Sequence, residues 1–367
     1  MRDLESCGIC NEEFEAEELI EFGGMQLCSD CLEHSTIVCD RCGARIWRDD
    51  NAGDSDTFLC RSCYDNHYTT CSHCERVIRE DDAHYEDDDT PLCYDCYHQR
   101  MNRYSIQPYG YKPAPIFYGD ACRYLGVELE LDCGGESDDH ARTLMELANT
   151  GEERIYIKHD GSLDDGMEIV TYPMSLSYHM NQMPWAEVLA KARELGYKSH
   201  QARTCGLHIH VNRTAFGDTV EEQEEVIARI LYFVEKHWEE LLKFSRRTQR
   251  QVEQWANRYG FHGEPIKILE HAKKGFSGVR YTAVNLTNAA TIEFRLFRGT
   301  LKYNSFIATL QLVNRICDCA VCLSDDELKQ MSWTTFAAGC TQYLELVQYL
   351  KERRLYVNEP VETEAEV

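Results

Sequence analysis

The chain has 367 residues, with 63 Asp and Glu against 38 Lys and Arg, so its formal net charge is -25. Hydrophobic residues make up 43% and charged residues 28%, which is the composition of an ordinary folded protein and excludes a disordered or collagen-like chain. This length favours two or more domains, and the large excess of negative charge makes nucleic acid a poor partner.

The beginning of the sequence, Met1 to Glu5, lacks the apolar region of a secretory signal. No run approaches the roughly 18 apolar residues of a membrane span. We therefore expect a soluble, intracellular protein of the cytoplasm with no membrane partner. In that setting the 19 cysteines indicate metal binding rather than disulfides.

Twelve of the cysteines form three similar units within the first 100 residues. Each unit has two Cys-x2-Cys pairs, separated by 17 residues in the first two units and by 18 in the third. The three sets are Cys7, Cys10, Cys28 and Cys31; Cys39, Cys42, Cys60 and Cys63; and Cys71, Cys74, Cys93 and Cys96. Four thiolates complete the tetrahedral coordination of a structural zinc ion and leave no position for catalysis. We predict three tandem zinc fingers, over about residues 7–34, 39–66 and 71–99, each dependent on its zinc ion for folding.

The spacing of these units resembles that of the treble-clef fingers in LIM domains and zinc ribbons. Seven residues separate successive units, which favours tandem single fingers over paired LIM modules. Residues 1–100 contain 25 Asp and Glu against 8 Arg and no Lys. Such a surface suits a protein partner or a structural role better than DNA.

A segment rich in proline and tyrosine follows the fingers. It contains Pro108, Pro113 and Pro115, which favour an extended connector. We therefore predict a linker over residues 101–120, a catalytic domain over residues 121–357 and an acidic tail over residues 358–367.

Strands and helices alternate after the linker. Period-two patterns predict strands over residues 124–132, 154–158, 167–171, 205–212, 280–286 and 291–300, the last two as an antiparallel pair. Helical patterns cover residues 137–149, 185–195, 227–242, 303–323 and 334–354. The C-terminal part therefore mixes strands with the helices that cover them.

Period-two alternation also gathers polar side chains on one face of these strands. They are Glu128, Glu130, Glu168, His208, His210 and Glu293, with Arg280, Arg295 and Arg298 beside them. Converging carboxylates repel one another unless divalent cations lie between them, and oxygen ligands with one or two imidazoles suit Mg2+ or Mn2+. Arginines suit phosphate groups. Because the chain has no Walker P-loop and no Gly-x-Gly-x2-Gly motif, a nucleotide would be held by metal and arginine.

Four blocks of sequence, in order, resemble the amidoligase family. They are Gly126 to Glu130; Asp160 to Ser162 with Glu168 and Pro173; Cys205 to Val211; and Arg280 to Leu286 followed by Thr291 to Thr300. That family belongs with the glutamine synthetase and gamma-glutamylcysteine synthetase carboxylate-amine ligases, and the resemblance covers about residues 121–325. It implies an α+β fold, in which an antiparallel sheet with packed helices forms an open funnel. It also implies that ATP, with Mg2+ or Mn2+, activates a carboxylate as an acyl phosphate for attack by an amine.

The resemblance implies roles by position. Metal ligation is implied for Glu128, Glu130, Glu168, His208 and Glu293, and these residues with His210 would also contact ATP. Arg280 and Arg295 resemble the arginines that stabilise the transferring phosphoryl group, and Asp160 resembles a residue that holds the attacking amine. Lys158 and Arg298 are further candidates for ATP contact.

Two other classes of function fit parts of the pattern. A zinc-finger adaptor with an inactive ligase-like domain would produce no ADP, but a residue is present for every proposed ligand role. A metal-dependent hydrolase would activate water on one transition metal without ATP, which leaves the arginines unexplained. The substrates stay open among small molecules, peptides and proteins, as does the oligomeric state. We expect the fingers to recruit a protein substrate or partner.

Overall fold

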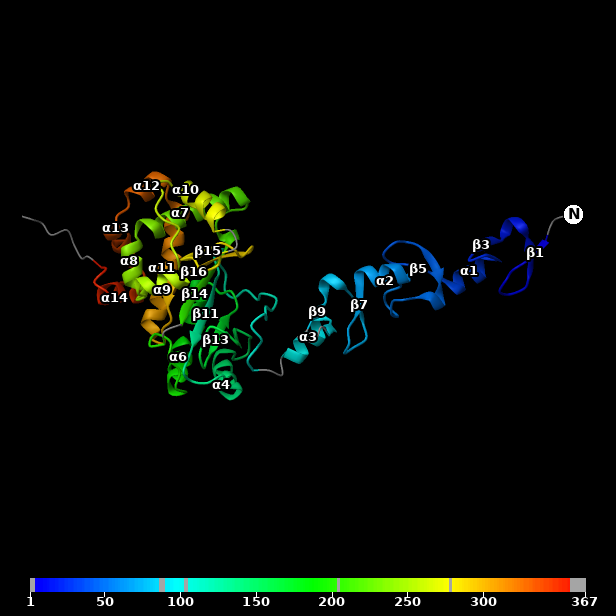
Figure 1. Ribbon diagram of the computed structural model, residues 1–367, viewed down its shortest axis with the longest axis horizontal. Coiled ribbons are helices and arrows are strands. Elements are labelled where there is room, and N and C mark those ends of the chain that lie inside the picture. Colours follow the sequence, from blue (N-terminus) through cyan, green and yellow to red (C-terminus); the bar gives the residue numbers. More distant parts are fainter. Residues whose placement is uncertain (1–3, 86–89, 102–104, 203–204, 277–278, 357–367) are drawn as a thin grey trace, which may run out of the picture. The chain divides into compact units, whose positions relative to one another are not determined.

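The computed structural model describes residues 4–85, 90–101, 105–202, 205–276 and 279–356. The chain divides into two compact units, Met1–Tyr104 and Ser105–Val367, and each is described by itself (Figure 1). The acidic tail predicted over residues 358–367 lies outside the described residues.

The first unit is a run of three similar fingers. In each, a short antiparallel hairpin carries the first Cys-x2-Cys pair, and the start of a helix carries the second. The strands are β1 (Leu4–Ser6), β2 (Glu13–Glu15), β3 (Ile20–Phe22), β4 (Met25–Leu27), β5 (Thr36–Val38), β6 (Arg45–Trp47), β7 (Tyr68–Thr70), β8 (Val77–Arg79), β9 (His84–Tyr85) and β10 (Pro91–Leu92). The helices are α1 (Ser29–Ser35), α2 (Arg61–His67) and α3 (Tyr94–Met101).

Successive fingers follow one another without a linker. Helix α1 ends at Ser35 and β5 begins at Thr36, and in the same way α2 ends at His67 and β7 begins at Tyr68. The seven residues expected to separate the fingers therefore form the end of one helix and the first strand of the next finger. The spacing of the cysteines could not reveal this, because those seven residues contain no ligand.

Side chains also join neighbouring fingers. The ring of Trp47 in the second finger packs against Phe22 in the first, with 4.8 Å between ring centroids. Asp54 in the second finger accepts a hydrogen bond at 2.7 Å from the backbone N–H of Val77 in the third. The three fingers are thus linked by direct contacts as well as by the chain.

The second unit is built on a six-stranded antiparallel sheet in the order β12-β13-β11-β14-β16-β15. Its strands are β11 (Leu125–Leu131), β12 (Ile155–Lys158), β13 (Met167–Thr171), β14 (Gly206–Asn212), β15 (Val284–Asn285) and β16 (Thr291–Arg298). One face is apolar and fully buried, and it includes Val127, Leu129, Ile169, Leu207, Ile209 and Ile292. Burial of this face against helices drives the folding of the unit.

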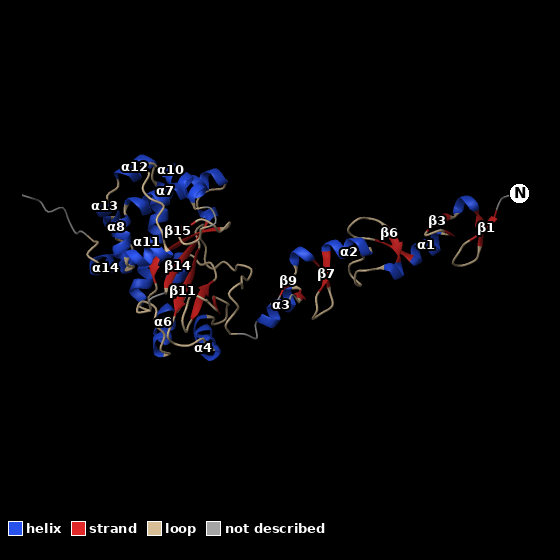
Figure 2. Cartoon of the chain, viewed as in Figure 1, coloured by secondary structure: helices blue, strands red, loops and turns tan. Residues whose placement is uncertain are grey.

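Helices lie beside this sheet (Figure 2). They are α4 (Asp138–Ala148), α5 (Leu176–Asn181), α6 (Trp185–Glu194), α7 (Val220–Lys236), α8 (Trp238–Ser245), α9 (Gln249–Trp255), α10 (Pro265–Gly275), α11 (Tyr303–Cys322), α12 (Asp325–Gln330), α13 (Trp333–Ala338) and α14 (Leu344–Glu352). The predicted α+β fold with an antiparallel sheet and packed helices is confirmed.

Two predicted helices are each divided in two. The helix predicted over residues 227–242 is α7 followed by α8, with a break at His237, where φ is -105° and ψ is 32°. The helix predicted over residues 334–354 is α13 and α14, and Gly339 ends the first of them. Both segments of each pair bury apolar side chains, so the hydrophobic periodicity continues across a break in the backbone and does not reveal it.

Helix α11 is long and apolar enough to cross a membrane by length and composition, although no such segment was expected from the sequence. In its most apolar 18-residue window, 72% of the residues are buried inside the structure. Helices α7 and α14 pack against it. A buried helix in a protein core can have the same length and apolar composition as a membrane span, so these two properties alone are weak evidence for a membrane.

The linker predicted over residues 101–120 is different in the structure, because the chain joins the second unit from Ser105 onward. The backbone N–H of Gln107 donates to the carbonyl of Ile157 at 2.7 Å, beside the edge strand β12. Tyr111 is buried, and Tyr118 pairs with Met174. The segment rich in proline and tyrosine is therefore extended. Because an edge strand has unpaired backbone groups, the extended segment can form hydrogen bonds with it.

Candidate active site and metal centres

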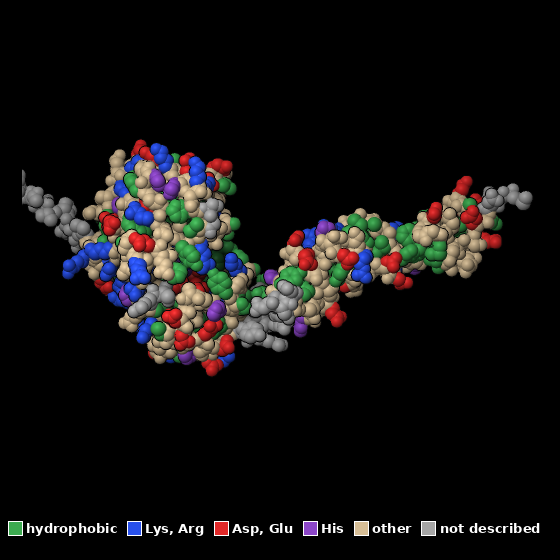
Figure 3. All heavy atoms as spheres, in the orientation of Figure 1, with side chains coloured by type: hydrophobic (Ala, Val, Ile, Leu, Met, Phe, Trp, Pro, Cys, Tyr) green, Lys and Arg blue, Asp and Glu red, His purple; other side chains and the backbone are tan. Residues whose placement is uncertain are grey.

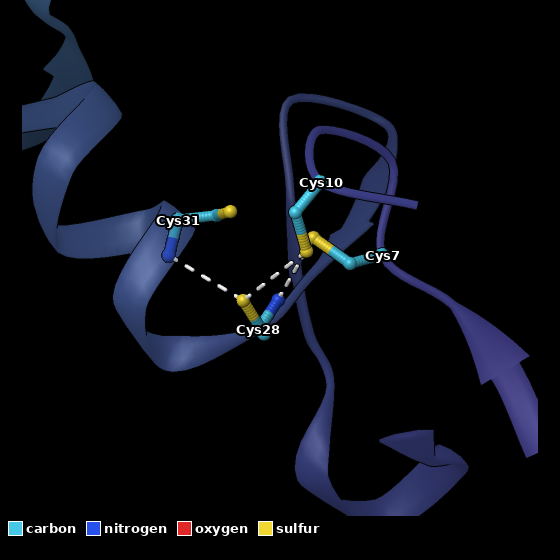
Figure 4. A group of neighbouring side chains, drawn as sticks. All are labelled: Cys7, Cys10, Cys28 and Cys31. Atoms are coloured by element: carbon cyan, nitrogen blue, oxygen red, sulfur yellow. Dashed lines mark hydrogen bonds between the residues drawn. The ribbon is translucent and has the colours of Figure 1, made fainter. Parts of the chain in front are cut away.

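The four cysteines of each finger converge. In the first finger, Cys7 and Cys10 lie in the turn between β1 and β2, Cys28 is the N-cap of α1, and Cys31 lies in its first turn (Figure 4). The side chains of these four residues point toward one another. In all three fingers the four sulfur atoms lie within 4.8 Å of one another.

The separations between sulfur atoms fit a zinc ion. A tetrahedron with Zn–S bonds of about 2.3 Å has edges of about 3.8 Å. The observed Sγ–Sγ distances are 4.0 Å for Cys10–Cys28, 3.9 Å for Cys42–Cys60 and 3.7 Å for Cys74–Cys93. Each set can therefore hold one tetrahedral metal ion.

The electrostatics of the first finger also favour a cation. The backbone N–H of Cys28 bonds to Cys7 Sγ at 3.4 Å and lowers the pKa of Cys7 to about 6. In contrast, the side chain of Cys28 raises the pKa of Cys31 to about 12. Four thiolates so close together repel one another, and a bound divalent cation removes that repulsion.

The polar face of the second unit's sheet collects the predicted acidic and histidine residues. In the register of the strands, Glu128 lies opposite His208, Glu130 opposite Glu168, and His210 opposite Glu293. Strands β11, β13, β14 and β16 therefore each contribute to one surface. This arrangement follows from the alternation of side chains along each strand.

Glu128 is central to this surface. Its Oε2 lies 3.3 Å from His208 Nδ1, and its Oε1 lies 3.2 Å from His210 Nε2. Glu293 Oε1 lies 3.7 Å from His208 Nδ1 and 3.9 Å from His210 Nε2. Both histidines thus lie close to the same two carboxylates.

The two histidines control the ionisation of these carboxylates. Burial alone would raise the pKa of Glu128, but His210 and His208 hold it well below its usual value. The same two histidines lower the pKa of Glu293 against the effect of burial. Glu128 in turn raises the pKa of His210 although burial opposes it. The cluster is therefore a set of coupled charges, which is common at functional sites.

Glu168 is in a different environment. Burial and the charge of Glu128 raise its pKa well above the usual value. Lys158 Nζ lies 3.3 Å from Glu168 Oε2 and partly compensates that charge. A divalent cation beside Glu168 would favour its ionised form.

The described residues form overlapping groups with the spacing of metal ligands. One contains Glu128, His210 and Glu293, and another contains Glu128, Glu168 and His208; in each, one ligand atom per residue lies within 4.8 Å of the others. Glu128 belongs to both groups. The donor set of carboxylates with an imidazole suits Mg2+ or Mn2+, so these residues fit divalent cations.

Glu293 is also held by its neighbours on β15 and β16. Asn285 Nδ2 donates to Glu293 Oε2 at 2.8 Å, and Arg295 Nη1 donates to Glu293 Oε1. Arg295 Nε is buried and has no hydrogen-bond partner. This arginine therefore keeps a donor available for an oxygen of a bound molecule.

Glu130 is partly committed to the backbone. Its Oε2 accepts the N–H of Gly206 at 2.5 Å, and its Oε1 lies 3.7 Å from His208 Nε2. A Cβ atom at Gly206 would lie 2.5 Å from His208 Nε2 and 2.9 Å from Arg247 Nη2. The absence of a side chain at Gly206 thus leaves room for the His208 ring and the Arg247 guanidinium.

A cavity of about 520 Å3 opens over this face of the sheet. Its lining includes the predicted residues Glu128, Glu130, Lys158, Asp160, Glu168, His208, His210, Arg280, Glu293 and Arg295. Asp160 is half-buried, and its side chain accepts the N–H of Ser162. The structure therefore brings ten of the predicted residues to one cavity.

Two of the predicted arginines lie away from the floor of the cavity. Arg280 is exposed at the rim, in the loop before β15, where its Nη1 donates to the hydroxyl of Tyr109 at 2.5 Å. Its guanidinium lies 5.0 Å from the centre of the Tyr281 ring. Arg298 does not line this cavity; it lies at the end of β16 and lines a neighbouring groove.

Other residues of the cavity were not predicted from the sequence. They are Tyr109, Gly110, Lys112, Ser162, Arg247, Trp255, Tyr281, Asn285, Thr287 and Asn288. Most come from loops or from the segment that was expected to be a linker. Nothing in the sequence distinguishes Arg247 from the neighbouring Arg246, which does not line the cavity.

Comparison with known proteins supports the resemblance seen in the sequence. Residues 146–317 match the family model described as "Putative amidoligase enzyme". This region contains β12, β13, β14, β15 and β16 and so most of the cavity. A search of curated proteins found no match.

Two solved structures are similar at low identity. One is a bifunctional glutathione synthetase from Pasteurella multocida, with 12% identity, a TM-score of 0.35, and coverage of 63% of this chain and 46% of that chain. Another is the complex between the prokaryotic ubiquitin-like protein Pup and its ligase PafA, with 10% identity, a TM-score of 0.31, and coverage of 66% of this chain and 59% of that chain. The match thus spans about half the length of these proteins. The predicted resemblance to the amidoligase family is confirmed, and it lies in the C-terminal unit over residues 146–317.

Proposed function

We propose that the protein is an ATP-dependent carboxylate-amine ligase that forms an amide bond through an acyl phosphate. The observation that carries this proposal is the convergence of Glu128, His208, His210, Glu293 and Arg295 in one cavity within an amidoligase-family region. In the proposed reaction, a substrate carboxylate attacks the γ-phosphorus of ATP and ADP leaves. An amine then attacks the acyl carbon, the amide bond forms, and phosphate leaves.

The metal-ligand groups are proposed to hold Mg2+ or Mn2+. Glu128 belongs to both groups, with His210 and Glu293 in one and with Glu168 and His208 in the other. When bound, the cations neutralise the phosphate charge that accumulates during transfer. Glu130 is proposed as a further ligand through Oε1, because its Oε2 is bonded to Gly206 and the residue lines the cavity.

Two arginines are proposed to stabilise the transferring phosphoryl group. Arg295 lies on the floor of the cavity and has a buried, unpartnered Nε. Arg247 is 7% exposed, lines the cavity and also has an unpartnered Nε. A guanidinium can bond two oxygens of one phosphoryl group and acts more strongly where water is excluded.

The rim of the cavity is aromatic. Tyr109, Trp255 and Tyr281 line it, and the rings of Trp255 and Tyr281 lie 5.6 Å apart. We assign the base of ATP to these rings, with Arg280 beside them. Lys158 is assigned to a phosphate oxygen, and Asp160 to the attacking amine, because its carboxylate lines the same cavity.

The fingers are proposed to bind three structural zinc ions and to recruit a protein substrate or partner. Asp and Glu side chains are spread over the visible face of this unit (Figure 3), which suits a partner with basic residues. A cytoplasmic setting belongs to this proposal, since reduced thiols are needed to bind zinc.

The decisive experiment measures ADP release from Mg-ATP by the zinc-loaded protein. Pooled amino acids, polyamines and cell extract supply carboxylates and amines. We expect ADP formation that needs both substrates and falls at least about 100-fold in Glu293→Gln and in Arg295→Ala. Glu187→Gln and Arg142→Gln, which change exposed residues on α6 and α4, serve as matched controls and should keep full activity.

Three results would contradict the proposal. One is the absence of both ADP formation and ATP binding, which is expected of an adaptor. Another is hydrolysis of a substrate without ATP, which is expected of a metal-dependent hydrolase. The third is full activity in Glu293→Gln and Arg295→Ala.

A further inference from the structure

Residues 105–118, which were expected to belong to a linker, lie beside the active-site cavity of the C-terminal unit, and we call this segment the strap. Gln107 pairs with Lys158 at the end of β12, and Tyr118 pairs with Met174. Backbone hydrogen bonds of 2.7 to 3.0 Å hold the strap at both points. Between these points, the residues that line the cavity are Tyr109, Gly110 and Lys112.

Tyr109 contacts two cations that line the cavity. Lys158 Nζ lies 5.5 Å from the centre of the Tyr109 ring, and Arg280 Nη1 donates to the Tyr109 hydroxyl at 2.5 Å. Lys158 is in turn paired with Glu168, at 3.3 Å. The sheet edge and a charged pair therefore fix the position of Tyr109, although 48% of its surface is exposed.

The contact between Tyr109 and Arg280 crosses the cavity from one edge of the sheet to the other. Tyr109 lies beside β12, and Arg280 lies in the loop before β15, and these two strands are the outermost ones in the sheet. Strands β13, β11, β14 and β16, which carry the carboxylates and histidines of the proposed metal site, lie between them. The two side chains therefore form a bridge at the rim, over the strands that carry the site.

Arg280 is held by groups without charge. Its guanidinium lies 5.0 Å from the centre of the Tyr281 ring. The hydrogen bond to Tyr109 raises the pKa of Arg280 although burial opposes it, and Tyr281 adds to the increase. Because a phenol does not neutralise a guanidinium, the positive charge of Arg280 remains available to an anion.

A hydrogen bond of this kind has a consequence for binding. A long arginine side chain at an exposed rim has many rotamers, and it loses that freedom when it contacts a bound molecule. An arginine that is already held in place has less freedom to lose, so its contact costs less free energy. A fixed acceptor such as the Tyr109 hydroxyl thus increases the contribution that Arg280 makes to affinity.

We propose that Tyr109 is a positioning residue of the nucleotide site, which holds Arg280 across the rim of the cavity so that Arg280 retains a bound nucleotide. This inference rests on the proposed ATP-dependent function and deepens it. Tyr109 precedes residues 146–317, which match the family model. The strap therefore adds to the site a side chain that the matched region does not contain.

Two roles of Tyr109 can be separated, because stacking on the base of ATP uses the ring and positioning of Arg280 uses the hydroxyl. Tyr109→Phe keeps the ring and removes the acceptor. The experiment is calorimetric titration of the full-length, zinc-loaded protein with the non-hydrolysable ATP analogue AMP-PNP in the presence of Mg2+. We expect Tyr109→Phe to weaken AMP-PNP binding at least about tenfold, since it removes a hydrogen bond to a charged group.

The matched control is Tyr118→Phe, the same substitution at another tyrosine of the strap. The Tyr118 hydroxyl donates to the carbonyl of Glu153 at 2.7 Å, and Tyr118 does not line the cavity. Tyr118→Phe should therefore leave the Kd for AMP-PNP unchanged. Thermal unfolding of each variant confirms that it is folded.

A double-mutant cycle distinguishes positioning from a general structural role. Arg280→Gln alone should weaken AMP-PNP binding, and the addition of Tyr109→Phe to Arg280→Gln should weaken it no further. In the ADP assay, Tyr109→Phe should raise the KM for ATP by about the factor seen in the Kd and leave kcat nearly unchanged, because Arg280 at the rim acts on binding.

Several outcomes would overturn the inference. They are an equal Kd in the wild type and Tyr109→Phe, losses of affinity that add in the double variant, and a fall in kcat with an unchanged KM. Intact ADP formation with an equal Kd in Tyr109→Phe would contradict only this inference. Weaker AMP-PNP binding in Tyr109→Phe without any ADP formation would contradict only the ligase, and a wild type that does not bind AMP-PNP would contradict both.

Discussion

Lys158 and Glu168 face each other across β12 and β13, with 3.3 Å between Lys158 Nζ and Glu168 Oε2. Only 3% of the Glu168 side chain is exposed, and burial and Glu128 already raise its pKa well above the usual value. Lys158 is the cation that opposes this effect most strongly. The pair therefore controls the charge at one edge of the proposed metal site.

Lys158→Met should destabilise the C-terminal unit by about 3 kcal/mol, because removal of one partner leaves a buried carboxylate uncompensated. Mg2+ should recover part of this loss, since a divalent cation would replace the missing charge. Urea unfolding with and without Mg2+ measures both effects. Lys158→Arg keeps the charge and should lose little; equal losses with and without Mg2+ would contradict the assignment of Glu168 to a metal.

Gly206→Ala should damage the active site more than the fold. The new Cβ would lie 2.5 Å from His208 Nε2 and 2.9 Å from Arg247 Nη2, so both side chains must move. We expect ADP formation to fall at least about 100-fold, as is typical when a site residue is displaced by about 1 Å. Gly126→Ala is the matched control on β11, because its Cβ would make only an ordinary contact of 3.5 Å with His210 Cβ. Equal activity in the two variants would contradict this role of Gly206.

The sequence was sufficient to predict which side chains share the polar face. Alternation along β11, β14 and β16 places Glu128, His208 and Glu293 there, whatever the order of the strands. It was not sufficient to predict that Glu128 lies opposite His208. That register joins strands 80 residues apart and depends on how the intervening helices pack.

Residues from irregular segments were harder to predict. Tyr109 reaches the cavity because residues 105–118 lie along the edge of the sheet, and a composition rich in proline and tyrosine does not distinguish such a segment from a free linker. The resemblance to the amidoligase family implied Arg298 as a further candidate for ATP contact, but this residue does not line the cavity. It lies opposite Gly206 at the end of the strand, beyond a shift of register between Leu207 and Ile209, and there it lines the neighbouring groove.

Asp54 should control the contact between the second and third fingers. Its Oδ2 accepts the N–H of Val77, and its Oδ1 accepts the N–H groups of Asp56 and Thr57. Although burial opposes it, these bonds lower the pKa of Asp54. In Asp54→Ala, hydrogen exchange at the Val77 amide should become at least about tenfold faster, because the loss of a hydrogen bond to a charged group costs about 1.5–3 kcal/mol. Asp49→Ala, an exposed residue of the same finger, should leave that exchange rate unchanged, and a rate unaffected by Asp54→Ala would contradict a coupled pair of fingers.

Each finger should lose its metal when one of its cysteines is removed. Native mass spectrometry of the purified protein should find three zinc ions, and Cys28→Ser should reduce the number to two. Because metal binding supplies on the order of 10 kcal/mol per site, the altered finger should unfold while the C-terminal unit keeps its thermal transition. Cys133→Ser, an exposed cysteine outside the fingers, should retain three zinc ions.

The same variant tests the role proposed for the fingers. Turnover of protein substrates should fall in Cys28→Ser, while turnover of small substrates should stay unchanged. Unchanged turnover of every substrate would contradict recruitment by the first finger.

His179 should make the C-terminal unit sensitive to acid. It is fully buried on α5, where its Nε2 lies 3.0 Å from the carbonyl of Leu125 and its Nδ1 accepts the indole N–H of Trp185 at 3.3 Å. Because an indole N–H only donates, Nδ1 must be unprotonated, and Nε2 carries the proton that is donated to Leu125. Protonation of Nδ1 would place two donors against each other.

Burial lowers the pKa of His179 to about 4. Below its ordinary value of about 6.5, the unfolded chain therefore binds a proton that the folded chain does not, and the free energy of unfolding falls with pH. Between pH 7 and pH 5 this one residue should remove about 2 kcal/mol. Urea unfolding across this range should show a loss about 2 kcal/mol smaller in His179→Gln, whose amide can still donate to Leu125, whereas His159→Gln, at an exposed histidine beside Glu136, should behave like the wild type. If His179→Gln and the wild type lost the same stability between pH 7 and pH 5, the neutral buried imidazole would not be the source of the acid sensitivity.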